Sequence, residues 1–212
     1  MSSQTGIVFL VDDDPRVLAA LARLLRAADF ETRSFSSAEE FLRDHEASVP
    51  GCLVLDVAMK GMSGIELKGW MTDTGCERPV IFLTGQGDIP MGVQAMKSGA
   101  ADFLVKPVKG EAFLTAVRLA LDRDRADRLA HAALTDVETR LAALTPRENE
   151  ILRYVIAGLL NKQIAAELGT SEKTVKAHRG RVMRKMGVRS VADLTRATMR
   201  AGIDPARQAS NR

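Results

Sequence analysis

The sequence predicts two domains of different classes, an α/β domain in the first 121 residues and an all-helical module near the C-terminal end. In the first half, short apolar runs alternate with segments of helical periodicity, which is typical of parallel strands joined by helices. The second half instead has helix starts and stops in close succession. Charge divides the chain in the same way, because residues 1–121 carry a net charge of −4 and residues 145–212 carry +8.

Four apolar runs in the first half have the length of buried strands, and a fifth, weaker run has the alternation of an edge strand. The four are residues 7–11, 52–55, 80–83 and 103–105, and the weaker one is 30–35. Helix starts lie between these runs: Asp14 before Pro15, the capping boxes Ser36/Glu39 and Ser63/Glu66, Asp88 before a helix at 91–97, and a last helix from Glu111. Five such units predict a doubly wound sheet whose site lies beyond the carboxyl ends of its strands.

Composition excludes several other classes of protein. No apolar run approaches the roughly 18 residues of a membrane span, and the first apolar run ends in aspartates rather than in a signal-peptide cleavage site. Cys52 and Cys76 form no disulfide pattern, which indicates a reduced cytoplasm. Three scattered histidines do not suggest a zinc site, and 4% aromatic residues argue against a single-strand binder that stacks bases.

Polar groups of a useful kind follow four of the predicted strands. Asp12–Asp14 follow the first, Asp56 ends the third, Thr84 ends the fourth and Lys106 follows the fifth. Clustered carboxylates suit Mg²⁺, and one of them could be the nucleophile toward a phosphoryl donor. A lysine and a hydroxyl would then stabilise the phosphoryl oxygens. The plainer alternative is that the aspartates only cap a helix and that the lysine is solvated.

The C-terminal module has four predicted helices. Thr145 and Glu148 form a capping box with Pro146 between them, Asn161 can cap a helix at 162–168, Ser171 a helix at 172–186, and Ser190 a helix that stops by Gly202. The second and third helices meet at a tight Gly169-Thr170 turn, which predicts a helix-turn-helix motif at about 161–180.

The third of these helices has two distinct faces. One face is the predicted core and carries Val175, Val182 and Met186. The other is mostly basic, with small residues that permit close approach, and carries Lys173, Lys176, Ala177, Gly180 and Arg184. Such a face fits a recognition helix in the major groove of DNA. The alternative is a basic face that is only solvated.

The segment between the two domains is predicted to be helical, since it lacks Gly and Pro after Gly110. Leu134, Val137, Leu141 and Leu144 share one helical face, and the Asp and Arg pairs of residues 122–128 are expected to be solvated. The plain interpretation is a long helix that continues the last helix of the first domain. A coiled-coil dimer seam is the alternative, which so short a repeat does not favour.

Two sets of motifs carry a resemblance to a known family. Residues 6–121 resemble the receiver domain of bacterial two-component response regulators through VDDDP at 11–15, LVLD at 53–56, GMSGIEL at 61–67, LTGQGDIPM at 83–91 and AMKSGAADFLVKP at 95–107. Residues 138–203 resemble the LuxR/NarL/FixJ-type DNA-binding domain through LTPRENEIL and NKQIAAELGTSEKTVKAHRGRVMRKMGVRS. The whole pattern is most similar to the FixJ subgroup, which includes StyR-type regulators. It implies a flavodoxin-like receiver with strand order 2-1-3-4-5 at 1–121, a helical linker at 122–137 and the DNA-binding domain at 138–212.

The resemblance assigns roles to the receiver residues. It implies that Asp56 accepts a phosphoryl group, and that Asp12, Asp13, Asp56 and the carbonyl of Ala58 hold Mg²⁺ or Mn²⁺, with Asp12 acting mainly through water. Lys106, before an expected cis bond to Pro107, would contact the phosphoryl group. Thr84 and Phe103 would be the switch pair. This chain departs from the family with Ala58-Met59-Lys60 after the acceptor and with Gln86, which leaves the lifetime of the phosphoryl group open.

The same resemblance assigns roles in the DNA-binding domain. Lys176 and Ala177 correspond to base contacts, with Lys173 on the same basic face, and the fourth helix corresponds to a dimerisation helix. The candidate phosphate contacts are Lys162, Thr174, His178 and Arg181. A half-buried packing histidine is the equally weighted alternative for His178.

We therefore expect a cytoplasmic transcriptional regulator that is phosphorylated by a sensor histidine kinase, dimerises, binds double-stranded DNA and acts with RNA polymerase. It would catalyse only its own phosphotransfer and dephosphorylation, so it is not expected to be an enzyme, and it has no membrane partner. One alternative is a DNA binder whose vestigial receiver is controlled by protein partners. Another is a phosphohydrolase, which would need a second carboxylate at the position of Ala58.

Overall fold

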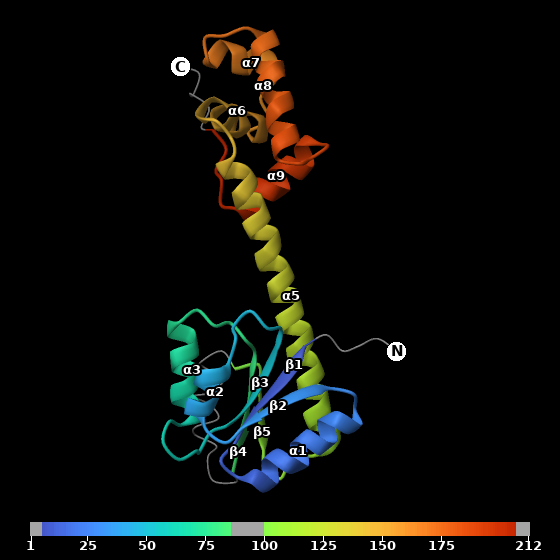
Figure 1. Cartoon of the computed structure of the whole chain (residues 1–212). Helices are drawn as coiled ribbons and strands as arrows, with labels where there is room; N and C mark the ends of the chain where they lie inside the picture. Colours follow the sequence, from blue (N-terminus) through green and yellow to red (C-terminus); the bar gives the residue numbers. More distant parts are fainter. Residues whose placement is uncertain (1–5, 86–99, 207–212) are drawn as a thin grey trace. The chain divides into compact units, whose positions relative to one another are not determined.

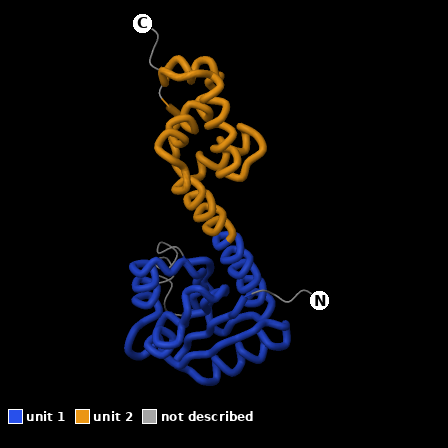
Figure 2. The backbone as a smooth tube through the Cα atoms, turned by 45° about the horizontal axis from the view of Figure 1, so that its top comes forward, with its two compact units in different colours: residues 1–128 blue, residues 129–212 orange. Residues whose placement is uncertain are grey.

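The computed structural model describes residues 6–85 and 100–206. The chain divides into two compact units, residues 1–128 and residues 129–212 (Figure 2). Helix α5 (Gly110–Ala142) contributes to both units. The predicted helix at 91–97, the start signal Asp88 and the family departure Gln86 all lie outside the described residues.

The first unit is built on a five-stranded sheet in the order β2-β1-β3-β4-β5. All neighbouring strands are parallel, so their carboxyl ends meet at one edge. The strands are β1 (Ile7–Val11), β2 (Glu31–Phe35), β3 (Gly51–Asp56), β4 (Val80–Thr84) and β5 (Asp102–Val105). The predicted fold class and strand order are confirmed, and β2 is an edge strand as its alternation predicted.

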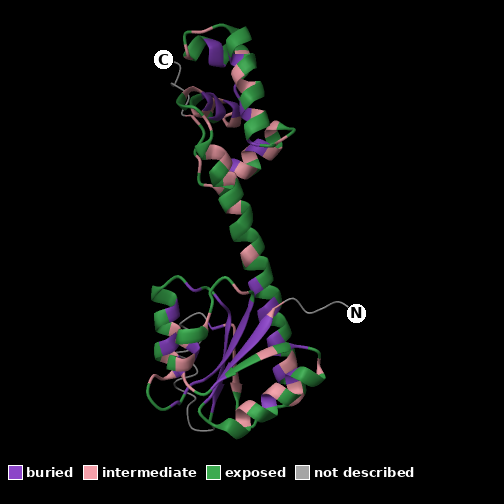
Figure 3. Ribbon diagram, in the orientation of Figure 1, coloured by how far each residue is buried: buried purple, intermediate pink, exposed green. Residues whose placement is uncertain are grey.

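Helices lie on both faces of this sheet (Figure 1), and an apolar layer separates the sheet from the helices on each face. Helices α2 (Ala38–Asp44) and α3 (Gly64–Asp73) cover one face, and α1 (Pro15–Ala27) and the first turns of α5 cover the other. Residues of β1, β3 and β4 are almost all buried, since both faces are covered (Figure 3). Continuous burial of this kind explains why these strands have unbroken apolar sequences.

Local capping fixes where the helices of the first unit begin. The Asp14 side chain caps α1 with Pro15 in the first turn, and Ser63 and Glu66 form a reciprocal capping box at α3, as predicted. The predicted Ser36/Glu39 box is wrong by one residue. Ser37 caps α2 by accepting a hydrogen bond from the amide of Glu40, and the Glu40 carboxylate accepts from the backbone and hydroxyl of Ser36.

The second unit packs four short helices on the end of α5. These are α6 (Pro146–Ile156), α7 (Asn161–Glu167), α8 (Glu172–Lys185) and α9 (Val191–Arg200). The predicted core of α8 is confirmed, since Val175, Val182 and Met186 are buried. Val137, Leu141 and Leu144 pack against the same core, which gives most of the predicted linker face a partner within this unit.

Four caps were predicted in the second unit, and those at Ser171 and Ser190 are confirmed. Thr145 and Glu148 form the predicted capping box at α6. Asn161 is not a cap but the first residue of α7, and its side-chain oxygen accepts a hydrogen bond from Arg179 of α8. The Gln163 side chain satisfies the amide of Leu160 instead.

The expectation that the charged pairs of residues 122–128 are solvated is wrong for one of them. Asp124 is 5% exposed and accepts hydrogen bonds from the amide of Gly51 and from the guanidinium of Arg128. Arg128 also donates to the carbonyls of the loop before β3, those of Ala47, Ser48 and Val49. The Arg123–Asp127 pair on the same helix is exposed, as expected.

Candidate functional site

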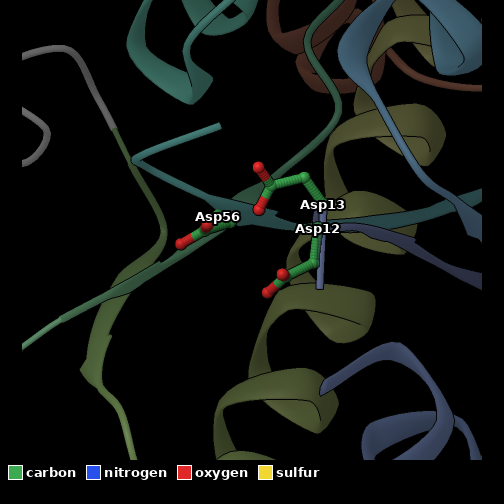
Figure 4. A group of neighbouring side chains, drawn as sticks. All are labelled: Asp12, Asp13 and Asp56. Atoms are coloured by element: carbon green, nitrogen blue, oxygen red, sulfur yellow. The ribbon is translucent and has the colours of Figure 1, made fainter. Parts of the chain in front are cut away.

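Three aspartates gather at the carboxyl ends of β1 and β3 (Figure 4). Asp12 and Asp13 directly follow β1, and Asp56 is the last residue of β3. Because the two strands are parallel neighbours, one carboxylate oxygen from each aspartate lies within 4.8 Å of the others. Asp12 and Asp56 are 2% and 5% exposed, so their charges are poorly hydrated.

Lys106 joins this cluster from the end of β5. Its Nζ lies 2.6 Å from Asp12 Oδ2 and 3.0 Å from Asp56 Oδ1. The amide of Lys106 donates to the carbonyl of Thr84, which ties the end of β5 to the end of β4. The bond from Lys106 to Pro107 is cis, as the resemblance implied. The solvated-lysine alternative is therefore excluded by the geometry.

The pKa values at this site reflect burial first and the neighbouring charges second. Burial raises the pKa of Asp56; the hydrogen bond from Lys106 offsets part of this effect, and the charges of Asp12 and Asp13 add to it. Burial lowers the pKa of Lys106, but hydrogen bonds to Asp12 and Asp56 outweigh it, so the net shift is upward. The lysine is thus held as a cation next to a carboxylate that is costly to ionise.

The other predicted receiver residues border this cluster or follow it along the chain. Thr84 is 1% exposed at the end of β4, and its hydroxyl donates to the carbonyl of Gly85 over 3.4 Å. Phe103 in β5 is partly buried against the core layer under α2 and α3. Ala58 is exposed two residues after Asp56, and the next residues place the amide of Lys60 against Asp13 Oδ2 at 3.3 Å.

The donor set of the cluster fits a hard divalent cation. Three carboxylates offer oxygen atoms, which Mg²⁺ and Mn²⁺ prefer over nitrogen or sulfur ligands. A divalent cation would also balance the charge that Lys106 alone leaves uncompensated. The residues present therefore fit Mg²⁺, and they pair it with a buried carboxylate and a fixed cation, which is the arrangement that phosphoryl transfer needs.

The second unit presents the basic face of α8 to solvent. Lys173, Lys176, Ala177, Gly180 and Arg184 are exposed, as are the candidate phosphate contacts Lys162, Thr174 and Arg181. His178 is half-buried, and its Nδ1 lies 3.0 Å from a guanidinium nitrogen of Arg181. This contact lies within α8, and both the phosphate contact and the packing alternative for His178 stay predictions.

The sequence predicted Glu148 only as a capping residue, and the structure shows a second role. Its carboxylate is 3% exposed and pairs with Lys185 at 2.6 Å and with Arg181 at 3.5 Å, both on α8. The hydrogen bond from Lys185 is the largest of the effects that lower the pKa of Glu148 to about 2. One carboxylate of α6 therefore fixes two cations of the helix that carries the basic face.

A parallel sheet with an acidic cluster at its carboxyl edge, followed by a helix-turn-helix, defines a signal receiver coupled to a DNA-binding module. Two family descriptions match the chain: "Response regulator receiver domain" over residues 8–118 and "Bacterial regulatory proteins, luxR family" over residues 142–198. The chain belongs to the response regulators that carry a LuxR-type DNA-binding domain.

Full-length relatives support this assignment. The chain is 44% identical to Nodulation protein W of Bradyrhizobium diazoefficiens over 202 residues, which cover 95% of this chain and 89% of that one. It is 41% identical to the transcriptional regulatory protein FixJ of Azorhizobium caulinodans, with 96% of each chain covered. The solved structure of the response regulator StyR is similar, with 45% identity, a TM-score of 0.85 and coverage of 92% of this chain and 98% of that one.

The family establishes the general function. The protein is a transcriptional regulator of a two-component system, with a sensor kinase and DNA as its partners, and its family consists of transcription factors rather than catalytic enzymes. Receiver domains of this family bind Mg²⁺ and are phosphorylated on aspartate, and an acidic cluster suited to both is present here. No helix in the described part of the chain is long and apolar enough to cross a membrane.

Proposed function

We propose that a sensor histidine kinase phosphorylates Asp56 and that the phosphorylated protein dimerises and binds an operator. The observation that carries this proposal is the position of Lys106, whose ammonium contacts both Asp12 and Asp56 within a cluster of three carboxylates. Asp56 combines burial with a place at the end of a strand. Together with its contact to Lys106 and the upward shift of its pKa, these features support Asp56 as the acceptor.

In the proposed transfer, an oxygen of Asp56 attacks the phosphorus atom of a phosphohistidine on the kinase. The new O–P bond forms as the N–P bond breaks, and the imidazole leaves with the electron pair. Lys106 then donates to a phosphoryl oxygen from its present position 3.0 Å from Asp56. Asp12, Asp13, Asp56 and the carbonyl of Ala58 would hold a Mg²⁺ or Mn²⁺ ion, which would supply charge neutralisation for the transfer.

The added charge on Asp56 would act on the neighbouring strand ends. The Thr84 hydroxyl moves toward the phosphoryl group, and the Phe103 ring turns inward behind it. Exposed apolar side chains on β5 and α5 support a receiver dimer on this side of the sheet, since Val105 is 45% exposed and Leu119 is 63% exposed. A two-fold dimer that covers these side chains follows from the switch.

In the DNA-binding unit, Lys176 and Ala177 contact bases, and Lys162, Lys173, Thr174, His178 and Arg181 hold phosphates or border the groove. Met199 on α9 is 72% exposed and supports contact between two modules through that helix. Two linked modules would bind half-sites about one helical turn apart, which raises affinity without new base contacts. We further propose a cytoplasmic location and contact with RNA polymerase at the promoter.

The decisive experiment is intact-mass spectrometry after incubation with Mg²⁺ and acetyl phosphate, followed by size-exclusion chromatography. We expect the wild type to gain one phosphoryl group and to shift toward a dimer, and we expect Asp56→Asn to do neither. Persistent label on Asp56→Asn would overturn the acceptor assignment. A wild type that neither gains mass nor binds Mg²⁺ would instead indicate a vestigial receiver controlled by protein partners.

A further inference from the structure

Gly180 occupies a position where nothing inside the protein calls for a glycine. It is the ninth of 14 residues in α8 and is exposed to solvent. A Cβ atom built on it would meet no heavy atom within 4 Å, so the space is open. Gly169 and Gly187, which lie before and after this helix, differ because their φ angles of 59° and 65° favour glycine. Gly180 is not among the residues with positive φ.

An unneeded glycine in a helix lowers stability. In an exposed helix interior, glycine is less favourable than alanine by enough to change a folding equilibrium constant about four- to five-fold. The unit has no packing or backbone reason to accept this loss at Gly180. Gly69 of α3 is equally exposed and equally open, so what singles out Gly180 is its place on the basic face of α8.

The surroundings of Gly180 indicate what approaches it. Lys176 and Arg184 lie one turn before and one turn after it, and Ala177 lies beside it on the same face. All three are exposed, on the side of α8 opposite the buried Val182. Gly180 is thus a shallow point between two cations, at the centre of the face that the proposed function directs into the major groove.

Resting on that proposed function, we propose that Gly180 is a specificity-determining position that admits the C5-methyl group of a thymine. Neither Gly180 nor Ala177 has a hydrogen-bonding side chain, so this part of the helix can discriminate bases only by shape and apolar contact. Among the base edges of the major groove, thymine alone presents a methyl group. The missing side chain gives the methyl room against the backbone, while Lys176 and Arg184 bind the flanking bases or phosphates.

The test removes a methyl group from the DNA and, in a second arm, adds a methyl group to the protein at residue 180. Duplexes are first selected from a random pool with the phosphorylated full-length wild type, and each thymine of the selected site is then replaced by deoxyuridine, which lacks only the methyl. We expect one replacement per half-site to weaken wild-type binding roughly four-fold, the effect of one buried methyl group. We expect Gly180→Ala to bind the thymine duplex more weakly than wild type does and to bind the deoxyuridine duplex at least as well as the thymine duplex.

Gly69 in α3 provides a matched control. It is also exposed within a helix, and a Cβ atom built on it would also meet nothing within 4 Å. Gly69→Ala and Gly180→Ala should both raise thermal stability, but only Gly180→Ala should change the response to deoxyuridine. Equal responses of wild type and Gly180→Ala, or no effect of any replacement, would overturn the inference. A wild type that selects no sequence at all would mark the failure of operator binding itself, and of this inference with it.

Discussion

Each unit contains a buried carboxylate paired with a lysine, and the two pairs behave in opposite ways. In the receiver Lys106 contacts Asp56 at 3.0 Å, and in the DNA-binding unit Lys185 contacts Glu148 at 2.6 Å. Around Glu148 two cations and a backbone amide serve one carboxylate, and its pKa falls to about 2. Around Lys106 one cation serves several carboxylates, and the pKa of Asp56 rises.

This difference separates a structural ion pair from a reactive one. A carboxylate with all its negative charge balanced stabilises the fold in one conformation, and Glu148 does so between α6 and α8. A carboxylate surrounded by other negative charges is stabilised when it binds a cation or forms a covalent bond that redistributes its charge. Burial is the largest effect on the pKa of Asp56, whereas the hydrogen bond from Lys185 is the largest effect on the pKa of Glu148, and this difference distinguishes the two pairs.

Removing the lysine of the reactive pair is expected to have the largest effect. Lys106→Met should slow phosphorylation by acetyl phosphate about 100-fold, because one fixed donor to the phosphoryl oxygens is lost. The rate is measured by intact mass against time at saturating Mg²⁺. Lys109→Met, an exposed lysine three residues away, should leave the rate unchanged. An equal rate in wild type and Lys106→Met would break the comparison.

Asp124 is a buried carboxylate of the receiver that forms a structural ion pair. It tests whether structural pairs stabilise the fold in the receiver as Glu148 does in the DNA-binding unit. Asp124→Asn should lower the free energy of unfolding of the receiver by about 1–3 kcal/mol, since the charged hydrogen bonds from Arg128 are weakened. Trp70, the single tryptophan of the chain, reports this transition by fluorescence in urea. Asp127→Asn removes an exposed pair of the same spacing and should change stability by less than about 0.5 kcal/mol.

The pH dependence of the structural pair provides a sharper test. The pKa of Glu148 lies at about 2, below its ordinary value of 4.5, so its ion pairs add stability that is fully present above pH 4.5. This contribution declines as the pH falls through about 2. Calorimetry of wild type and Glu148→Gln should therefore show a difference that shrinks between these values. Glu150→Gln, which alters an exposed pair with Arg147, should show little difference at any pH.

The smallest expected effect is a gain in thermal stability rather than a loss. Without Mg²⁺, Asp56→Asn should raise the thermal midpoint of the receiver slightly, because the raised pKa of Asp56 means that its charged form is disfavoured in the folded state. Trp70 fluorescence follows the transition, and Glu77→Gln at an exposed site is the control. A lower midpoint for Asp56→Asn would show that the pair with Lys106 outweighs the crowding of carboxylates.

Local sequence patterns were sufficient to predict the receiver fold and the positions of its acidic residues. Asp12, Asp56, Thr84 and Lys106 each follow or end an apolar run, and parallel pairing brings such strand ends to one edge. The caps at Thr145 and Ser171 were also predictable, because a capping bond spans only three residues.

What the sequence did not reveal depends on contacts between distant residues. Asp124–Arg128 and Arg123–Asp127 have the same four-residue spacing in opposite charge order, and only Asp124–Arg128 packs on the loop before β3. Asparagine is a common helix cap, but the side-chain oxygen of Asn161 accepts a hydrogen bond from Arg179 on another helix. The pairing of Glu148 with Lys185 spans 37 residues, beyond the reach of any local rule.

The bond between Asp124 and Gly51 has a practical consequence for dividing the protein. Gly51 is the first residue of β3 and Asp56 is its last, so α5 holds one end of this strand while Asp56 lies at the other. A fragment that ends at residue 121 would keep all five strands of the sheet. It would lose the Asp124 carboxylate that binds the amide of Gly51 and the Arg128 guanidinium that binds the loop before β3. An isolated receiver should therefore extend at least to Arg128, seven residues past its apolar core.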